Sequence, residues 1–275
     1  MGVDARRDAA LQPLAPGETI RIAHGALAVD IASDAGGRIA QITCDSREWL
    51  IGHDAANAGA IAWGCYPMLP WAGRVRDGQF KFEGRAYALH RNLGAHAIHG
   101  VGFTLPWQVD AHTPRRIDLS LTLPTDERWP FGGIARQRID VAQNTLRMHL
   151  SVTAGTHAMP CVIGWHPWFR KAERLLFRPQ VHYPRDAHGI ATTPPAPPPP
   201  GPWDDCFINH RPVQMWRDTQ RVQLTSDCTH WVIYDEPPHA HCVEPQSGPP
   251  DAFNLEPNVL APGATLAAWF LMEWV

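Results

Sequence analysis

The segment GWHPWFR (164–170) places a histidine, which titrates near neutral pH, in a rigid aromatic setting. Pro167 favours extended backbone at His166, and Trp165 and Trp168 can shield the imidazole from water and tune its pKa. A histidine held in this way is suited to proton transfer. A core histidine hydrogen-bonded to a neighbouring strand would show the same pattern, so this segment alone leaves both interpretations open.

A second histidine follows in GAHAIHGVGF (94–103). Gly100 and Gly102 allow the backbone to turn tightly, which can bring His99 to the rim of a pocket. His96 is the local alternative to His99, and a structural His-Gly loop is the competing interpretation.

A carboxylate follows a short apolar stretch in HAHCVEPQSGPPDAFN (239–254), where Pro245 ends the expected strand directly after Glu244. A carboxylate that emerges from a buried strand is costly unless it is paired. Glu244 is therefore either an ion-pair partner or a general base.

The same stretch contains H-x-H-x-x-E, three potential metal ligands that resemble a cupin metal motif. Alternate residues of a strand share a face, so Glu244 lies on the opposite face from His239 and His241 unless a bulge intervenes. The cupin spacing before the glutamate is also longer. We predict no metal site and no cofactor.

Two further loops could bind hydroxyl or carboxylate groups. YPMLPWAGRVRDGQF (66–80) offers Arg74 beside Trp71, with solvated surface arginines as the alternative. GPWDDCFINH (201–210) places Asp204 and Asp205 before an expected strand, where an aspartate can also bind its own backbone.

The elements that would position these residues are short strands. Glycine (22 residues) and proline (27 residues) punctuate the whole chain and leave little room for long helices. RIDLSLTL (116–123) and TLRMHLSV (145–152) alternate apolar and polar residues, as half-buried antiparallel strands do, and GQFKFEGRAYAL (78–89) predicts a hairpin that turns at Glu83-Gly84. Further strands are expected in GALAVDIA, RIAQITC, QRIDVA, RVQLTS, HWVIYD and the C-terminal run TLAAWFLMEWV.

These patterns predict an all-β protein, a large antiparallel sandwich formed as a single domain over residues 1–275. We expect residues 1–17 to be a loosely ordered N-terminal segment. The proline-rich stretch TTPPAPPPPGPW (192–203) is expected to be a stiff surface loop, although it could separate two domains or bind a proline-reading module.

Charge and cysteine content narrow the class of protein. The chain has 24 Lys plus Arg and 27 Asp plus Glu, and its net charge of -3 gives no basic surface for nucleic acid or an anionic membrane. The six cysteines are scattered singly, which predicts reduced and mostly buried thiols. The opening MGVDARRDAALQPLAPG lacks the apolar core of a secretory signal, so we expect a cytoplasmic protein. We expect the protein to be a monomer or a homodimer.

The order of these motifs resembles the aldose 1-epimerase (galactose mutarotase) family from about residue 18 to 275. WAGRVRDGQFKFEGRAYAL, AIHG, WHPWF, DDCF and CVEPQ follow one another as that family's arginine, His-Gly, His-Pro-aromatic, aspartate and glutamate segments do. The family's asparagine before the arginine is Gly73 here, its following isoleucine is Val75, and the usual tyrosine after His-Pro is Trp168.

The resemblance implies the family's β-sandwich and an enzyme that interconverts the α and β anomers of a free aldohexose, a small-molecule monosaccharide. By this resemblance Glu244 is the catalytic carboxylate. Its charge suggests that an ionised Glu244 is the base and an imidazolium at His166 the acid, while His99 polarises the ring oxygen or steadies the sugar. Arg74 and Asp204, or Asp205 in its place, would bind the remaining hydroxyls.

Trp165 and Trp71 are expected as aromatic surfaces for the sugar. The alternatives are an enzyme for hexose 6-phosphates, with Arg74, Arg76 and Arg91 as the phosphate site, and a non-catalytic sugar-binding protein of the same fold.

Overall fold

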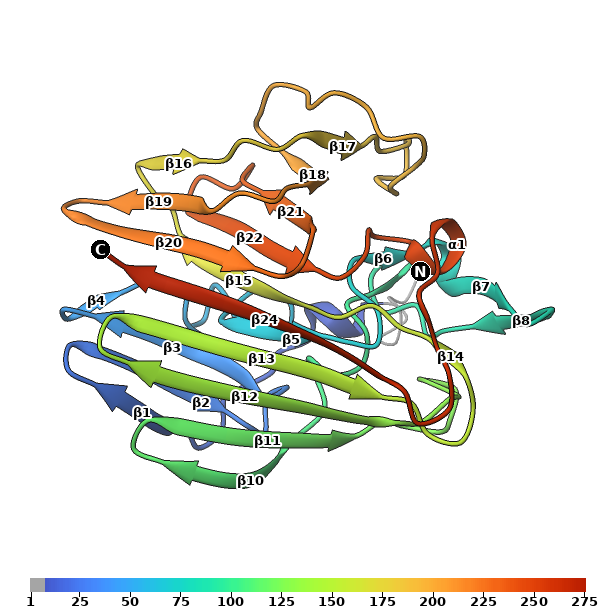
Figure 1. Cartoon of the computed structure of the whole chain (residues 1–275), viewed down its shortest axis with the longest axis horizontal. Coiled ribbons are helices and arrows are strands. Elements are labelled where there is room, and N and C mark those ends of the chain that lie inside the picture. The colour runs from blue at the N-terminus through green and yellow to red at the C-terminus, as the bar shows by residue number, and fades with distance from the viewer. Residues whose placement is uncertain (1–7) are drawn as a thin grey trace.

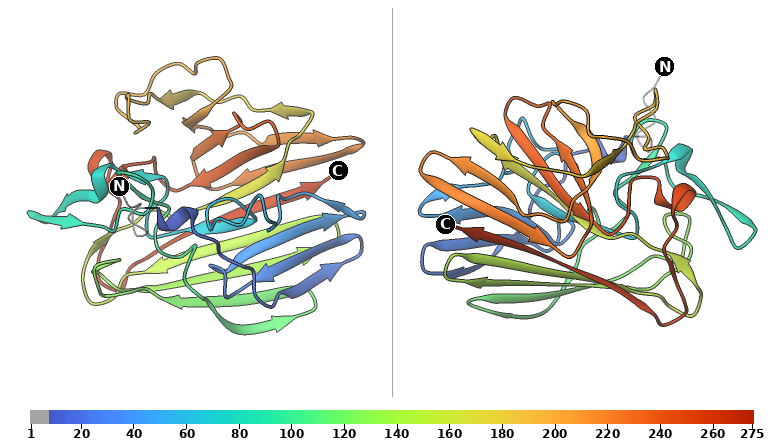
Figure 2. Two further views of the ribbon diagram at one scale, coloured as in Figure 1. Left: turned by 180° about the vertical axis from the view of Figure 1, so that it is seen from behind. Right: turned by 45° about the horizontal axis from the view of Figure 1, so that its top comes forward.

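The computed structural model describes residues 8–275, which form two large antiparallel sheets that face each other (Figures 1 and 2). The first sheet has ten strands in the order β1-β2-β3-β5-β15-β22-β21-β18-β17, with β4 paired to β3. The second has eight strands in the order β10-β11-β12-β13-β24-β20-β19-β16. The prediction of an all-β antiparallel sandwich is confirmed.

The strands of the first sheet are β1 Ile20–His24, β2 Leu27–Ala32, β3 Arg38–Cys44, β4 Arg47–Glu48, β5 Cys65–Met68, β15 Gly164–Arg170, β17 Val181–Tyr183, β18 Asp204–Ile208, β21 His230–Tyr234 and β22 Ala240–Gln246. Those of the second sheet are β10 Gln108–Thr113, β11 Arg116–Thr122, β12 Ile134–Ala142, β13 Thr145–Thr153, β16 Arg174–Leu176, β19 Val213–Arg217, β20 Gln220–Ser226 and β24 Thr265–Trp274. Three short pairs and three helical turns complete the chain: β6 Arg74–Val75 with β9 Ala97–Ile98, β7 Gln79–Phe82 with β8 Arg85–Ala88, β14 Met159–Pro160 with β23 Val259–Leu260, η1 Ala9–Leu11, η2 Arg76–Gly78 and α1 Ala252–Leu255.

Apolar alternation places the strands of the second sheet. In β11 and β13 every second residue is buried, and the polar residues between them are partly or fully exposed. The predicted hairpin is confirmed, because β7 and β8 pair with Phe82 opposite Arg85 and turn at Glu83-Gly84. It projects at the end of the sandwich where α1 lies (Figure 1).

The first sheet is covered on both faces at its centre. All four residues of β5 and all seven of β22 are buried, which a strand with one solvated face would not show. One face packs against the second sheet, and connecting segments cover the other. A deep pocket can form on the face of the first sheet that points away from the second sheet, because connecting segments surround the central strands there.

The structure describes most of the N-terminal segment and all of the proline-rich stretch. Residues 8–17 are not loosely ordered, since Ala10 is buried and the backbone of Ala10 and Leu14 donates hydrogen bonds to Asn92 and Ala58. Residues 1–7 of that predicted segment lie outside the described residues. Residues 192–203 connect β17 to β18 as a loop.

All six cysteines are free and buried, as predicted. Within the described chain, none of the helical segments has the length and apolar content needed to cross a membrane.

Arg38 is a fully buried cation at the start of β3. Its guanidinium donates to four backbone carbonyl oxygens, those of Ala35 (2.6 Å), Ala60 (2.8 Å), Trp63 (3.0 Å) and Phe103 (2.7 Å). It also lies 4.3 Å from the ring centroid of Trp63 and 5.0 Å from that of Tyr66, within reach of cation–π attraction. Burial lowers the pKa of Arg38 to about 10, which still leaves the side chain charged near neutral pH. Arg38 thus joins three segments of the chain that are far apart in sequence.

We expect Arg38→Met to lower the free energy of unfolding by about 3 kcal/mol or more. The substitution leaves four buried carbonyl oxygens without this donor, and an unsatisfied buried group costs about 1–3 kcal/mol. Urea unfolding followed by circular dichroism measures the change. Arg21→Met is the matched control, because the Arg21 side chain is 59% exposed and a surface change costs within about 0.5 kcal/mol. Equal midpoints for the two variants would contradict the structural role of Arg38.

Candidate active site

Strand register brings the two central candidates together. β15 and β22 pair with Gly164 opposite Gln246 and Trp168 opposite Cys242. His166 and Glu244 lie midway between these pairs, so they face each other on adjacent strands. Both side chains leave the sheet on the face away from the second sheet.

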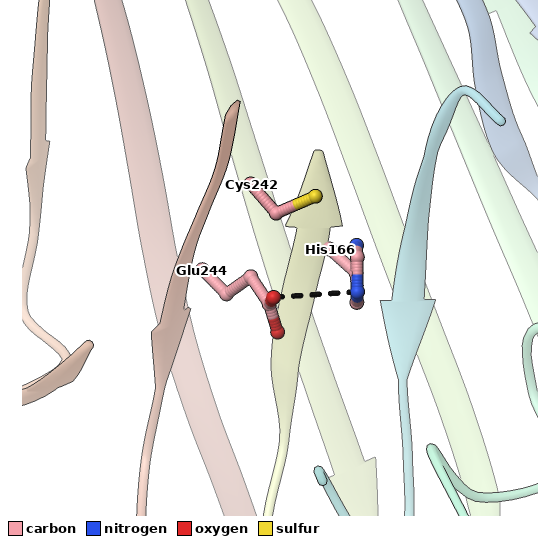
Figure 3. A group of neighbouring side chains, drawn as sticks. All are labelled: His166, Cys242 and Glu244. Carbon is pink, nitrogen blue, oxygen red and sulfur yellow. Dashed lines mark ion pairs between the residues drawn. The ribbon is translucent and has the colours of Figure 1, made fainter. Parts of the chain in front are cut away.

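His166 and Glu244 form a direct contact deep in the protein (Figure 3). The Nε2 atom of His166 lies 3.3 Å from Oε1 of Glu244, and the two residues are 5% and 2% exposed. Gln246 donates from Nε2 to the other carboxyl oxygen, Oε2, at 3.3 Å. A proton can pass between a carboxyl oxygen and an imidazole nitrogen at this distance.

Burial opposes charge on both members of the pair. It raises the pKa of Glu244 well above its usual value, and nearby Asp204 raises it further. Burial lowers the pKa of His166 to about 3. The expected roles require an imidazolium beside an ionised carboxylate, whereas the surroundings favour a neutral carboxylic acid beside a neutral imidazole.

Two aromatic rings fix the orientation of His166. Tyr66 and Trp168 stack on it with centroid distances of 4.8 and 5.4 Å and interplanar angles of 25° and 22°. Their polar atoms converge on one acceptor, since Tyr66 Oη and Trp168 Nε1 both donate to the carbonyl oxygen of Ile61, at 3.1 and 2.7 Å. The imidazole therefore lies between two rings that are themselves held in place.

Trp165 and Trp71 do not line the cavity, so the prediction that they contact the substrate is wrong. Trp165 is the neighbour of His166 on β15 and points to the opposite face, where it packs on Phe270 of the second sheet. Trp71 packs on Trp129 and is 3% exposed at a separate hollow. Neither tryptophan lines the cavity at His166 and Glu244, whereas Trp168 does.

His99 reaches the same cavity from the loop after β9. Its ring meets that of His166 edge to face, with centroids 5.0 Å apart. The backbone N–H of Gly73 donates to Nδ1 of His99 at 3.3 Å, so the ring proton belongs on Nε2. Burial lowers the pKa of His99 well below its usual value, and His166 and Arg74 lower it further. His99 is thus a neutral donor, while His96 accepts from Asp77 N–H in an exposed loop and does not line the cavity.

Two glycines make the position of His99 possible. Gly73 has φ +67°, and a Cβ there would lie 2.6 Å from Pro250. Gly100, with φ +76°, has even less room, because a Cβ would lie 1.8 Å from the carbonyl oxygen of Leu69. At Gly73, where the family has an asparagine, Pro250 occupies the space that a side chain would need.

Charged side chains gather at the mouth of the cavity. Arg185, in the loop after β17, contacts Oδ2 of Asp204 at 2.6 Å through Nη1 and Oδ1 of Asp205 at 3.2 Å through Nε. Burial raises the pKa of Asp204, while Arg185 and then Arg74 lower it. Arg74 also lines the cavity, and among the described residues it has no ion-pair partner.

The cavity has a volume of about 290 Å³. This is near the lower end of ordinary ligand pockets, so it suits one small polar molecule. His99, His166, Glu244, Arg74, Asp204 and Asp205 all contribute to its wall, together with Trp168, Tyr234, Glu236, Gln246 and Arg185. The structure therefore brings the predicted candidates to one place, apart from the two tryptophans.

The arginines considered as a phosphate site do not converge. Arg76 is paired with Asp186 at 2.6 Å, and neither Arg76 nor Arg91 lines the cavity. The cupin-like set does not form either, because His241 accepts from the N–H of Ala172 on the opposite face from Glu244. A different set of metal-type donors is present: one ligand atom each from His166, Cys242 and Glu244, all within 4.8 Å of one another.

Sequence reasoning missed Tyr66 and Arg185. Tyr66 precedes a proline in an apolar strand, so its sequence resembles that of any core residue. Arg185 lies in YPRDAHGI, where Arg-Asp before a glycine is typical of an exposed turn. Cross-strand contacts from distant segments give both residues their place, and these contacts leave no local signal.

Comparison with known proteins identifies relatives and a fold. The family model named Aldose 1-epimerase matches residues 18–273. Two uncharacterised proteins of Escherichia coli K12 are similar in sequence: YphB is 34% identical over 58% of this chain and 54% of its own length, and YihR is 25% identical over 64% and 60%. The matched region thus spans little more than half of these relatives.

Solved structures share the fold at low sequence identity. A galactose mutarotase-like protein from Clostridium acetobutylicum has a TM-score of 0.83 at 15% identity, covering 98% of this chain and 99% of that one. Galactose 1-epimerase from Lactobacillus acidophilus has a TM-score of 0.79 at 17% identity, covering 94% of each chain. The predicted galactose mutarotase type of sandwich is confirmed.

We expect Gly100→Ala to destabilise the protein much more than Gly84→Ala. The two glycines have nearly the same φ, +76° and +75°, but a Cβ at Gly84 meets nothing within 4 Å. An alanine in this left-handed conformation costs about 1–2 kcal/mol, and this cost is common to both variants. The clash with Leu69 should add about 2 kcal/mol or more at Gly100. Urea unfolding of both variants checks this, and equal losses would show that the His99 loop tolerates a side chain there.

Proposed function

Because this chain belongs to the aldose 1-epimerase family, we propose that it interconverts the α and β anomers of a free aldohexose. The observation that carries the proposal is the buried contact between His166 and Glu244 at the wall of a cavity of about 290 Å³. A carboxyl group and an imidazole in direct contact can supply the acid and base that anomer exchange requires.

The chemistry calls for two proton transfers at neighbouring atoms. Ring opening removes the proton of the C1 hydroxyl and adds one to the ring oxygen, and both oxygens are bonded to the same carbon. An acid and a base that act on them must therefore lie side by side. The 3.3 Å contact between Glu244 and His166 supports this arrangement.

In the proposed mechanism Glu244 accepts the proton of the C1 hydroxyl and His166 donates one to the ring oxygen. The carboxylic acid of Glu244 first passes its proton to Nε2 of His166. Glu244 is then the carboxylate that accepts the hydroxyl proton, and His166 is the imidazolium that donates to the ring oxygen. The open-chain aldehyde then rotates about C1–C2 and recloses on the other face of the carbonyl, with the two groups in exchanged roles. Because burial disfavours separated charges, both groups return to neutral forms between turnovers.

His99 has the third role in this proposal. Its Nε2–H can donate to the ring oxygen, which stabilises the charge that develops as the C1–O bond breaks. The hydrogen bond from Gly73 fixes this tautomer, so His99 polarises the oxygen without itself being the proton source.

The remaining hydroxyls would meet Arg74, Asp204 and Gln246. An arginine and an aspartate offer donors and acceptors to adjacent hydroxyls, and the Oε1 atom of Gln246 has no protein partner in the described structure. Trp168 and Tyr234 supply apolar surface for the C–H faces of a pyranose.

A purely sugar-binding protein of this fold is the second candidate. Binding alone gains nothing from two ionisable groups buried in contact at the cavity wall, because their burial is costly. The pair therefore favours catalysis over binding alone.

We expect Glu244→Gln and His166→Asn each to lower the catalysed rate by about two orders of magnitude, the typical contribution of one proton-transfer group. Polarimetry of freshly dissolved α-glucose or α-galactose measures the rate above the spontaneous one. Glu83→Gln and His112→Asn, at exposed positions far from the cavity, make the same chemical changes and should leave the rate unchanged. Wild-type rates in both site variants would rule out the proposed pair.

We also expect free glucose to compete with α-galactose more strongly than glucose 6-phosphate does. Of the three arginines considered for a phosphate, Arg74 alone lines the cavity. Arg185 is already engaged by two aspartates, and Glu236 and Asp204 add negative charge that opposes the binding of a phosphate. Inhibition constants for the two sugars in the same polarimetric assay decide this. Tighter binding of the phosphorylated sugar would favour a hexose 6-phosphate enzyme instead.

A further inference from the structure

A thiol that the proposed mechanism does not use lies beside the catalytic pair. Cys242 is two residues before Glu244 on β22, so both side chains leave the same face of the strand. Its sulfur points toward His166 (Figure 3), and one ligand atom each from Cys242, His166 and Glu244 lie within 4.8 Å of one another. All three residues are buried, with Cys242 fully so.

The distance within the pair matches that between two ligands of one small cation. Nitrogen and oxygen ligands lie about 2.0–2.1 Å from a tetrahedral zinc ion, which separates two of them by about 3.3–3.4 Å. The His166 Nε2 and Glu244 Oε1 atoms are 3.3 Å apart. These two atoms are therefore already spaced as ligands of one ion, and the sulfur lies within 4.8 Å of both.

The donor types and their charges select the class of ion. Imidazole, thiolate and carboxylate are ligands of zinc and of similar borderline or soft ions, whereas calcium and magnesium prefer sets made of oxygen alone. One thiolate and one carboxylate balance the charge of a divalent ion, so the loaded site would be neutral. Neutrality matters in a site this deep, because an uncompensated buried charge is very costly.

The site would also have the open position of a reactive zinc centre. Three protein ligands leave a fourth tetrahedral position, and His166 and Glu244 line the cavity toward which that position would face. An ion can therefore enter from the sugar cavity and hold a water molecule or a sugar hydroxyl there.

We propose that His166, Cys242 and Glu244 form a binding site for one divalent ion of the zinc class, and that this ion inhibits the enzyme. On binding, the Cys242 thiol and the carboxylic acid of Glu244 each lose one proton to solvent as the metal–ligand bonds form, with no change of oxidation state. Nε2 of His166 and a carboxyl oxygen of Glu244 become ligands, so neither can exchange protons with a sugar. The inhibition rests on the proposed function, whereas the binding does not.

Cobalt(II) is the probe for the binding site, because its bond to a thiolate gives a charge-transfer absorption in the near ultraviolet. The full-length protein is first treated with a chelator and then titrated with cobalt chloride. We expect one equivalent to bind with this absorption, and zinc chloride to displace it. A titration of the wild-type protein without the band would overturn the proposal.

Two serine variants assign the sulfur. Cys242→Ser should lose the band and weaken cobalt binding about tenfold or more, since even the loss of an outer-shell partner costs about 10–100-fold. Cys206→Ser is the matched control: Cys206 is also buried and lines the cavity from β18, but it lies outside the three-residue group. It should bind cobalt like the wild type.

Other outcomes of the serine variants would overturn the assignment. Cobalt binding of wild-type strength and spectrum in Cys242→Ser would do so, as would loss of the band in Cys206→Ser alone. Circular dichroism confirms that each variant is folded, and Cys242→Ala replaces Cys242→Ser if the serine variant is not.

Inhibition is tested by polarimetry with added zinc chloride. We expect zinc to abolish the catalysed rate and a chelator to restore it. The half-inhibitory concentration should rise about tenfold or more in Cys242→Ser when each protein is compared with its own zinc-free rate, in line with the lost ligand. Cobalt binding without zinc inhibition would refute the inhibitory role alone. If the chelator-treated protein accelerates mutarotation of no aldose, the proposed function is refuted, but the metal-binding result is unaffected.

Discussion

The contact between Glu244 and His166 is the interaction on which the rest of the site depends. Both groups are buried and in direct contact, and burial favours the neutral form of each. The surrounding structure is arranged to hold that geometry. Tyr66 and Trp168 clamp the imidazole, and both are hydrogen-bonded to the carbonyl oxygen of Ile61. The ring plane is thus set by a backbone atom from a third segment of the chain.

The support extends from Tyr66 to Arg38. The Arg38 guanidinium lies over the rings of Tyr66 and Trp63 and binds carbonyl oxygens before, within and after the segment that leads into β5. A buried cation held by carbonyl dipoles, with no carboxylate paired to it among residues 8–275, adds positive potential near His166. That potential acts in the same direction as burial and keeps the imidazole neutral. A structural arginine therefore contributes to the chemistry of a histidine that it does not touch.

Local pattern was sufficient to predict the fold but not all of the site. Alternation in β11 and β13 and the turn at Glu83-Gly84 are local signals, and they gave correct strands. Motif order placed His99, His166 and Glu244 at one cavity. The error at Trp165 has a simple physical cause: adjacent residues of a strand face opposite sides, so a residue next to His166 cannot share its pocket. Tyr66, Arg38 and Arg185 act through contacts between distant segments, which no local pattern records.

Gly73, where the sequence departs from the family's asparagine, contributes to the site through its backbone. The residue has a left-handed backbone and no space for a side chain, because Pro250 occupies that space from the segment after β22. What the position supplies is its backbone N–H, which sets the tautomer of His99. A backbone donor is independent of side-chain identity, so the tautomer survives the exchange of asparagine for glycine. The wall of the cavity at this edge is formed by Gly73 and Pro250, in place of an asparagine side chain.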